Sequence, residues 1–538
     1  MSPWDWLVIG AYLCAVVAVG LWMGRRDKNI EDYFLGGRRI PWGAALLSMV
    51  ATEISAATFL GAPEQGYTRD LTYLQFGIGS ILARFVLAFL FIGVFYRLRL
   101  ITVYGFLTSR FGVGTKNGAA AMFLLGRFFA GGSRLFIASL AVSIVTGLNP
   151  TYAIILLGTL AVIYTLFGGI KAVIWTDVAQ AMVLMAGAIL SIYFLWRDIG
   201  LPGAQVSAIL RDNAKLQFFD TAWRDERGSL ALFSNAFHFV PAILGGFFLT
   251  MATHGTDQAM IQRLLTCRDS FRGRLSMVLS GFLGMGITTM FMAVGLLLFV
   301  YGTTLGGDHP MALIAAELAE NGQNGYFFLH YILHQLPPGL SGLLIAAVIA
   351  AAMSSMDSEL NAMSATFVND FYTPYFKRRE TPAFYMRVAR LATLGFGAVL
   401  IFIGALIADF YATNPDTDLL SIALGVMTFF YGGLLGIFLL GLLTRRRGSQ
   451  KSTLLGLGLS TVLIIFIGYK GAILERLGLH SAEGGGSFFH WLYQSSLSWP
   501  WFIVLGTATA VAVAMTGKTA AHLYAGKPDA RGRETPNG

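Results

Sequence analysis

The chain has 538 residues, of which 55% are hydrophobic and only 12% are charged, and its mean hydropathy is +0.64. Soluble domains carry roughly 25% charged residues, so this composition excludes a large soluble enzyme with a hydrated surface. The formal net charge of +9 does not indicate a nucleic acid partner, because Lys and Arg stand at the ends of apolar runs. We therefore predict an all-α polytopic membrane protein that is embedded in the lipid bilayer.

The sequence lacks the residue patterns of several other function classes. Cys14 and Cys267 lie in an apolar segment and a basic loop, which gives neither a disulfide framework nor a metal-binding spacing. No GxxxxGK[ST] loop indicates an ATP-driven pump, and no nucleophile–base pair indicates an enzyme.

The first apolar run, Leu7 to Met23, is predicted to be a retained helix and not a signal peptide. Asp5 precedes it and Arg25 follows it, which reverses the charge order of signal peptides and places the N-terminus outside. Two long polar segments, 198–232 and 303–339, are expected to hold short surface helices. Further runs long enough to span a bilayer, giving about 13 helices in all, lie at 42–62, 73–96, 119–147, 151–167, 171–196, 233–253, 275–301, 340–370, 386–409, 419–443, 453–470 and 499–517.

The distribution of basic residues supports this topology, because cytoplasmic loops are enriched in Lys and Arg. With the N-terminus outside, the loops expected to be cytoplasmic contain Arg38 and Arg39, Arg110 and Lys116, Arg263 and Arg268, Lys377 to Arg379, and Arg445 to Arg447. The opposite segments 303–339 and 410–418 contain no Lys or Arg. An odd number of helices places the polar segment 518–538 in the cytoplasm as a tail, and the protein in a cell membrane.

A polar cluster lies within the apolar run 42–62. Glu53 stands there among small and hydroxyl-bearing residues, and Gly61 and Pro63 follow. Such a composition favours a helix that breaks in mid-membrane and frees carbonyl oxygens for a cation or substrate. The alternative is helix packing through small residues, but a buried carboxylate also needs a cation, a partner or a proton. The other polar residues of this cluster are Thr52, Ser55 and Thr58.

A second polar cluster lies within 340–370. Ala351, Ser354, Ser355 and Ser358 recur at helical spacing and form one hydroxyl-lined stripe. Asp357 adds a carboxylate, and hard oxygen ligands of this kind suit Na⁺.

Three further charged residues lie within apolar runs. Asp177, in 171–196, needs a partner within the membrane, unless it pairs with Lys171 at the cytoplasmic end. Arg127 and Arg134 are seven residues apart and share one face of a helix. Either could pair with Glu53 or with a ligand carboxylate, or extend to the membrane interface.

These motifs together resemble the sodium:solute symporter family over nearly the whole chain. The matching segments are Ile54 to Gly61, Ala172 to Asp177, Gln258 with Gln262-Arg263, Ala351 to Asn361, Asp370 to Tyr372, and Phe438 to Gly441. The resemblance implies a LeuT-type fold with two inverted five-helix repeats, at 42–196 and 233–443. One extra helix, 1–24, precedes the repeats, and two helices at 453–517 follow them within a single transporter domain.

The resemblance also implies alternating access driven by Na⁺ as the coupling ion. Carried over by position, the principal sodium site uses backbone oxygens of Ala51, Ile54 and Ala351 and the hydroxyls of Ser354 and Ser355. A second site, found in some members, corresponds to Asp177 with Ser354 and Ser358, and Asp357 stands where a hydroxyl residue can occur. Two sodium ions are therefore expected for each solute.

The resemblance narrows the solute to a small organic molecule. Thr58 and Gly77 stand where galactose-type members carry Gln and Glu, which argues against a galactose-like pocket. Ser55 and Thr58 resemble the hydroxyl pair of sialic-acid-type members, and Arg127 or Arg134 could bind a substrate carboxylate. The remaining residues expected in the cavity are Glu53, Tyr73, Gln75, Phe76, Thr250 and Thr253.

The leading hypothesis is a Na⁺-coupled importer of a sugar acid or carboxylate such as sialic acid. The alternatives are a symporter of a sugar, polyol or amino acid, which Glu53 favours, and a membrane sensor or channel. We expect a monomer with no obligate protein partner.

Overall fold

The computed structural model describes residues 1–24, 30–224, 228, 230–376, 380–413, 419–479, 490, 493–495 and 497–519. These residues form helices, loops and three isolated bridges, and none of them belongs to a β-sheet. The expected basic residues Arg25 and Lys377 to Arg379, and the tail from residue 520 onward, lie outside the described residues.

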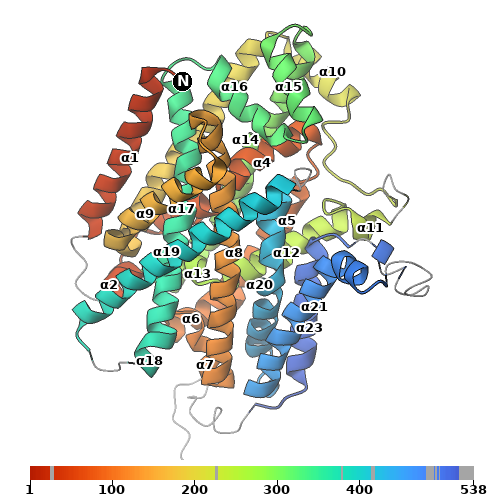
Figure 1. Cartoon of the computed structure of the whole chain (residues 1–538). Helices are drawn as coiled ribbons and strands as arrows, with labels where there is room; N and C mark the ends of the chain where they lie inside the picture. Colours follow the sequence, from red (N-terminus) through yellow and green to blue (C-terminus); the bar gives the residue numbers. More distant parts are fainter. Residues whose placement is uncertain are drawn as a thin grey trace, which may run out of the picture.

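The membrane-spanning part is built from long apolar helices (Figure 1). Within the described residues, nine helices are long and apolar enough to cross a membrane, and one bent pair passes the same test together. The helices of the first half are α1 (Pro3–Gly24), α2 (Ile30–Leu35), α3 (Trp42–Glu53), α4 (Ala56–Thr68), α5 (Leu74–Leu87), α6 (Gly93–Arg97), α7 (Gly105–Phe111), α8 (Val113–Thr146), α9 (Pro150–Ile199) and α10 (Gly203–Asp212). The second half contains α11 (Ala231–Ser234), α12 (Phe239–Gly255), α13 (Gln258–Leu265), α14 (Ser270–Thr304), α15 (Pro310–Glu320), α16 (Phe327–Gln335), α17 (Leu340–Thr366), α18 (Thr373–Tyr375), α19 (Pro382–Thr413), α20 (Leu419–Leu443), α21 (Gln450–Arg476) and α23 (Pro500–Met515).

The helices confirm the all-α prediction, and each expected apolar run lies on one or more of them. The runs 151–167 and 171–196 form two helical segments of α9, which meet at a kink at Gly169. Gly169 has φ of 56° and ψ of −175°, a backbone conformation that residues other than glycine rarely adopt. The expected surface helices are α10, α15 and α16. Figure 1 shows these three at the end of the molecule opposite α7 and α18.

Each half of the chain contains an interrupted helix. The helices α3 and α4 meet at an angle of 61°, with Ile54 and Ser55 between them. In the second half, Thr256 and Asp257 separate α12 from α13. The run 42–62 therefore breaks in the middle, as its polar and small residues predicted.

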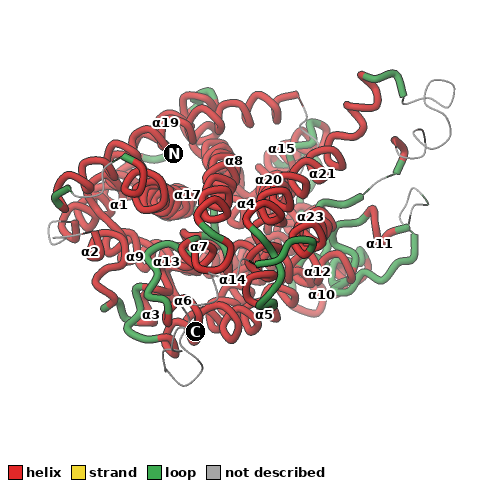
Figure 2. Tube along the Cα trace, turned by 90° about the horizontal axis from the view of Figure 1, so that it is seen from below, coloured by secondary structure: helices red, strands yellow, loops and turns green. Residues whose placement is uncertain are grey.

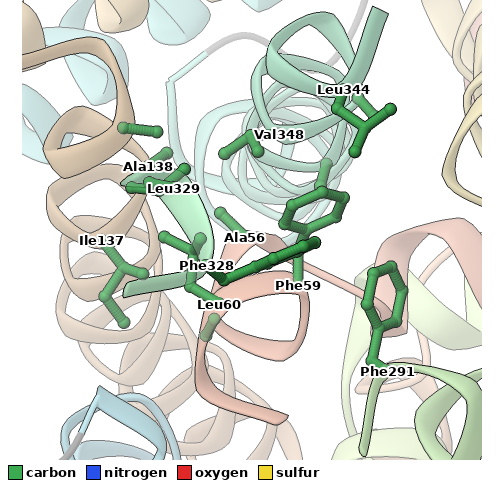
Figure 3. Packing of buried hydrophobic residues seen from close by; sticks show 14 of the residues in the cluster. Ala56, Phe59, Leu60, Ile137, Ala138, Phe291, Phe328, Leu329, Leu344 and Val348 are labelled. Carbon is green, nitrogen blue, oxygen red and sulfur yellow. The ribbon is translucent and has the colours of Figure 1, made fainter. Parts of the chain in front are cut away.

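Aromatic side chains pack α4 against α14 and α16, at the end of the molecule that carries α15 and α16. Figure 3 shows Phe59 of α4 between Phe328 of α16 and Phe291 of α14. The ring centroids lie 5.5 Å and 4.9 Å from Phe59, respectively. Aromatic pairs at such distances add roughly 0.5–1.5 kcal/mol each beyond the burial of their area. The surface helix α16 is thus packed directly on the broken segment.

The extra helix α1 packs against α9 and α17. Its Asp5 Oδ1 accepts hydrogen bonds from the backbone N–H groups of Gly339 and Gly342, at 2.7 and 2.9 Å. These donors belong to the start of α17, where helix N–H groups lack partners within the helix. A side chain of α1 therefore caps the N-terminus of α17.

Candidate functional site

The break between α3 and α4 frees two backbone carbonyls that the sequence had assigned to a cation. In a continuous helix, Ser55 N–H would donate to Ala51 O, and Thr58 N–H to Ile54 O. Instead, Ser55 N–H donates to Glu53 O and Thr58 N–H to Ser55 O, at 3.0 and 2.9 Å. Ala51 and Ile54 are both buried, so their carbonyl oxygens are available to an ion within the protein.

The hydroxyl stripe of α17 faces this break, as predicted, although its members have different partners. Ser355 Oγ lies 3.4 Å from the carbonyl oxygen of Thr52 and 3.2 Å from that of Ala351. Ser354 Oγ, in contrast, donates to Asp177 Oδ1 at 2.5 Å. The structure therefore brings Ala351 and Ser355 to the break, and it joins Ser354 to the carboxylate of α9.

Asp177 is the centre of a second buried cluster. Its Oδ2 accepts a hydrogen bond from Ser48 Oγ at 2.5 Å and from Arg263 Nη2 at 2.9 Å. Arg263 Nη2 also contacts Ser358 Oγ, which donates in turn to Asp357 Oδ1 at 3.1 Å. The predicted acid and hydroxyls of the second sodium site therefore lie together. A guanidinium occupies the same cluster.

Arg263 had been assigned to a cytoplasmic loop, but its side chain is fully buried. It belongs to α13, a helix of eight residues whose members are all buried. A carboxylate buried without a partner is costly, and this arginine supplies the positive charge for Asp177 in the described structure.

A cavity of about 120 Å³ opens beside the break, between α3, α4, α5, α8, α14 and α20. Predicted residues that line it are Glu53, Ser55, Thr58, Tyr73, Phe76 and Arg134. The wall also contains residues that were not predicted to bind substrate: Ile54, Ala57, Leu74, Gly77, Ser80, Arg84, Gly281, Gly284, Met285, Thr288, Ala423 and Leu424.

One end of the cavity carries an ion pair that the sequence analysis did not identify. Arg84 Nη2 of α5 lies 2.5 Å from Glu53 Oε2 and 3.0 Å from His254 Nε2. Arg84 Nη1 donates to Ser80 Oγ at 3.1 Å, and Thr250 Oγ1 donates to that same oxygen at 2.8 Å. Glu53 thus has its cationic partner on α5 and not on α8, where it had been sought.

Arg134 reaches the cavity from α8. Its Nη1 donates to Glu359 Oε1 at 2.8 Å, whereas its Nη2 contacts, among the described residues, only a weak acceptor, the sulfur of Met427, at 3.9 Å. The side chain is 11% exposed, and Glu359 is fully buried. The ion pair holds the guanidinium in position and leaves a hydrogen-bond donor for a ligand in the cavity.

Arg127 is buried and is not among the residues that line the cavity. It forms ion pairs with Asp257 Oδ2 at 2.5 Å and with Glu359 Oε1 at 2.7 Å. Tyr431 donates its phenol proton to the same Asp257 oxygen. Arg127 therefore has two carboxylate partners already, and Arg134 is the fourth-span arginine that faces the cavity.

Three other residues that were predicted to bind substrate form hydrogen bonds within the protein instead. Gln75 donates its amide to the carbonyl oxygens of Thr72 and Phe237, at 3.1 and 2.9 Å. Thr250 bonds to Ser80, and Thr253 to the carbonyl oxygen of Leu249 at 2.9 Å. None of the three is among the residues that line the cavity in the described part of the chain.

Comparison with known proteins agrees with this geometry. A family model described as "Sodium:solute symporter family" matches residues 33–456. The chain belongs to this family. The symporter is 30% identical over 471 residues to the sodium/sialic acid symporter SiaT of Proteus mirabilis, covering 86% of this chain and 89% of that one. It is 29% identical to the sodium/sialic acid symporter NanT of Aliivibrio fischeri over 86% and 87% of the two chains.

A solved structure supports the same conclusion. The symporter resembles a Na⁺-coupled sialic acid symporter in a substrate-bound, outward-open state, with a TM-score of 0.77 and 25% identity over 96% of this chain and 97% of that one. The protein is therefore a multi-pass membrane transporter of a small solute, and sodium is its coupling ion.

Proposed function

We propose that this symporter imports a small sugar acid, of the sialic acid class, together with sodium by alternating access. The observation that carries the proposal is Arg134, whose guanidinium lines the cavity and keeps a donor free of strong acceptors. An arginine binds carboxylates with charge-assisted hydrogen bonds. Ser55 and Thr58, on the wall of the same cavity, supply hydroxyls for the polar groups of such a solute.

The relatives also support this choice of solute. The proteins of Proteus mirabilis and Aliivibrio fischeri both carry sialic acid in their names, and each covers most of this chain. Both relatives therefore support a sugar acid as the class of solute.

The test compares a sugar acid with its methyl ester, which has no negative charge and is larger by one methyl group. Purified symporter is reconstituted into proteoliposomes, and uptake of N-acetylneuraminic acid is measured with an inward Na⁺ gradient. One charge-assisted contact is worth about 1.5–3 kcal/mol, which corresponds to roughly a 10- to 150-fold preference for the acid over the ester. Arg134→Gln should lose this preference, and Thr288→Ala, elsewhere in the wall, should keep it. Equal discrimination by Arg134→Gln and the wild type would contradict the proposal.

The principal sodium site is proposed to consist of the Ala51, Ile54 and Ala351 carbonyls with the Ser354 and Ser355 hydroxyls. The freed carbonyls at the break and the position of Ser355 support this assignment. Ser355→Ala should lower the apparent affinity for Na⁺ in uptake assays by about 10-fold, because one of five oxygen ligands is lost. Ser364→Ala, nine residues further along α17, is the control. An unchanged Na⁺ dependence in Ser355→Ala would refute the assignment.

A neutral sugar, polyol or amino acid is the second candidate, and Glu53 favours it. This carboxylate is 30% exposed in the cavity wall and could accept hydrogen bonds from hydroxyl or ammonium groups. Uptake of these solutes in the same proteoliposomes, competed against the sugar acid, distinguishes the two candidates.

The remaining proposals concern the whole chain. We place the N-terminus outside and the C-terminus in the cytoplasm, with the repeats at 42–196 and 233–443 around the cavity. The positive-inside rule supports this orientation. We also propose that the protein acts as a monomer without an enzymatic step.

A further inference from the structure

A basic hollowed surface surrounds the loop that leads into α3, and none of the residues in its walls lines the cavity. Two hollows of about 640 and 750 Å³ flank this loop and share Arg39, Ile40 and Pro41 in their walls. Lys171 and Trp175 of α9 complete the first hollow, and residues at the start of α14 complete the second. Figure 2 shows α2, α3, α9 and α13 gathered at this side of the molecule. We call the two hollows together the basic surface.

The loop is held in a fixed conformation. Gly36, Gly37 and Arg38 have φ values of 60°, 64° and 54°, so the chain turns sharply through three left-handed residues. Arg38 adopts this conformation although it is not glycine, and its side chain donates to the carbonyl oxygen of Leu100 at 3.0 Å. Ile40 N–H donates to the carbonyl oxygen of Thr266 at 3.2 Å. The first bond joins the loop to the segment after α6, and the second joins it to the segment between α13 and α14.

The charge of the basic surface is only partly neutralised by the protein. Lys171 has Asp32 at 3.7 Å, and Arg272 has Asp269 at 3.5 Å. Arg39 and Arg268 are exposed, and no carboxylate of the described residues lies within ion-pair distance of either. Their two guanidiniums therefore face a hollow from separate segments, with donors available for an anion.

Aromatic side chains border the same hollows. Trp42 and Trp175 lie in the walls and are 39% and 38% exposed, and Phe271, next to Arg272, is 74% exposed. Exposed Trp at the end of a membrane helix is typical of the layer where lipid headgroups meet acyl chains. Because α3, α14 and the second part of α9 all begin here, the basic surface lies at the level of the headgroups.

We propose that the basic surface binds an anionic phospholipid, with the Arg39 and Arg268 guanidiniums on its phosphate and Trp42 and Trp175 beside its acyl chains. Basic pockets between membrane helices bind acidic headgroups, and each Lys or Arg near an anionic membrane surface adds about 1 kcal/mol. The positive-inside orientation assigns the lipid to the cytoplasmic leaflet. The binding itself is independent of the solute that the cavity takes.

Native mass spectrometry of the full-length symporter tests the proposal. Delipidated protein in neutral detergent is titrated with phosphatidylglycerol and, in parallel, with phosphatidylcholine of the same chains. The wild type should retain phosphatidylglycerol in preference to phosphatidylcholine. Arg39→Gln/Arg268→Gln should weaken its apparent affinity by about 30-fold, the effect of two charges at the magnitude given above. Arg445→Gln/Arg446→Gln removes two exposed arginines from another loop on the same side and should leave the affinity unchanged.

Each alternative result overturns the proposal. An equal loss in both double variants would indicate non-specific attraction to net charge, and displacement of the lipid by millimolar inorganic phosphate would indicate a site for a soluble anion. A second measurement does not depend on removing arginines. Phosphatidylglycerol with brominated acyl chains should quench tryptophan fluorescence less in Trp42→Phe/Trp175→Phe than in the wild type, and equal quenching of the two would place the lipid elsewhere.

Discussion

The buried cluster of Arg127, Arg134, Asp257 and Glu359 is neutral only as a whole, and this makes a sharp prediction about single substitutions. Arg127→Met leaves Asp257 with two neutral donors, the phenol of Tyr431 and the backbone N–H of Ala259, and with no cation, whereas Glu359 keeps Arg134. Removing one member of a buried ion pair costs about 3–5 kcal/mol, because the other charge stays buried without compensation. Asp257→Asn should cost less, because Arg127 keeps Glu359 at 2.7 Å.

The double variant Arg127→Met/Asp257→Asn removes both charges together. It should be more stable than the sum of the single effects predicts, by at least about 2 kcal/mol, because neither remaining group is left as an uncompensated ion. Thermal unfolding of the purified protein, followed by intrinsic fluorescence, measures this difference. Because the unfolding entropy scales with chain length, a change of 1 kcal/mol in the free energy of unfolding shifts the melting temperature by roughly 1 °C in a chain of this size.

The exposed neighbouring pair formed by Arg197 and Asp198 provides the control. Its arginine side chain is 52% exposed, and exposed pairs contribute about 0–1 kcal/mol. Arg197→Gln should therefore change the melting temperature little. Additive effects of Arg127→Met and Asp257→Asn in the double variant would refute the argument, since additivity would mean that the two charges are not coupled.

Three further predictions concern other parts of the symporter. Gly131→Ala should lower the melting temperature by about 1–3 °C, because its Cβ would lie 2.2 Å from Glu359 Oε2 and overpacking costs about 1–3 kcal/mol, whereas Gly286→Ala meets no atom within 4 Å and should be neutral. Asp177→Asn should reduce the ratio of Na⁺ to solute in flux measurements from two to one, and an unchanged ratio would exclude a second sodium site at this carboxylate. Burial lowers the pKa of Lys215, in the loop after α10, to about 8. Between pH 8 and its usual pKa the unfolded chain holds one more proton than the folded chain, so folding should become more stable as pH rises, and Lys215→Met should lack this increase in its melting temperature.

The sequence predicted the broken helix and the hydroxyl stripe because both depend on local composition. Glu53 among small residues and the serines at helical spacing can be recognised without knowing what they contact. The sequence did not reveal which residues these side chains contact. Arg84 lies 31 positions from Glu53 on another helix, and the packing of α14 on both α3 and α5 brings them together.

Arg263 shows a different limit of prediction. A basic residue after an apolar run is normally a marker of the cytoplasmic side, and α13 is too short to be recognised as a buried helix. One signal was present: Met260 and Ile261 precede this arginine, and Leu264 and Leu265 follow it. Apolar residues on both sides of an arginine indicate burial, and a buried arginine requires a carboxylate partner such as Asp177.

The cap formed by Asp5 has a mechanical consequence for alternating access. The two N–H groups that it binds begin the helix that carries Ser354 and Ser355, and a Cβ on Gly342 would lie 2.5 Å from the backbone of Asp5. Contact this close leaves no room for the two helices to slide past each other. Any tilt of the ion-binding helix during the cycle must therefore carry the first helix with it, or else expose two unpaired donors at its outer end. The first helix, although it lies outside the predicted repeats, is therefore expected to move together with α17, whose serines we propose as sodium ligands.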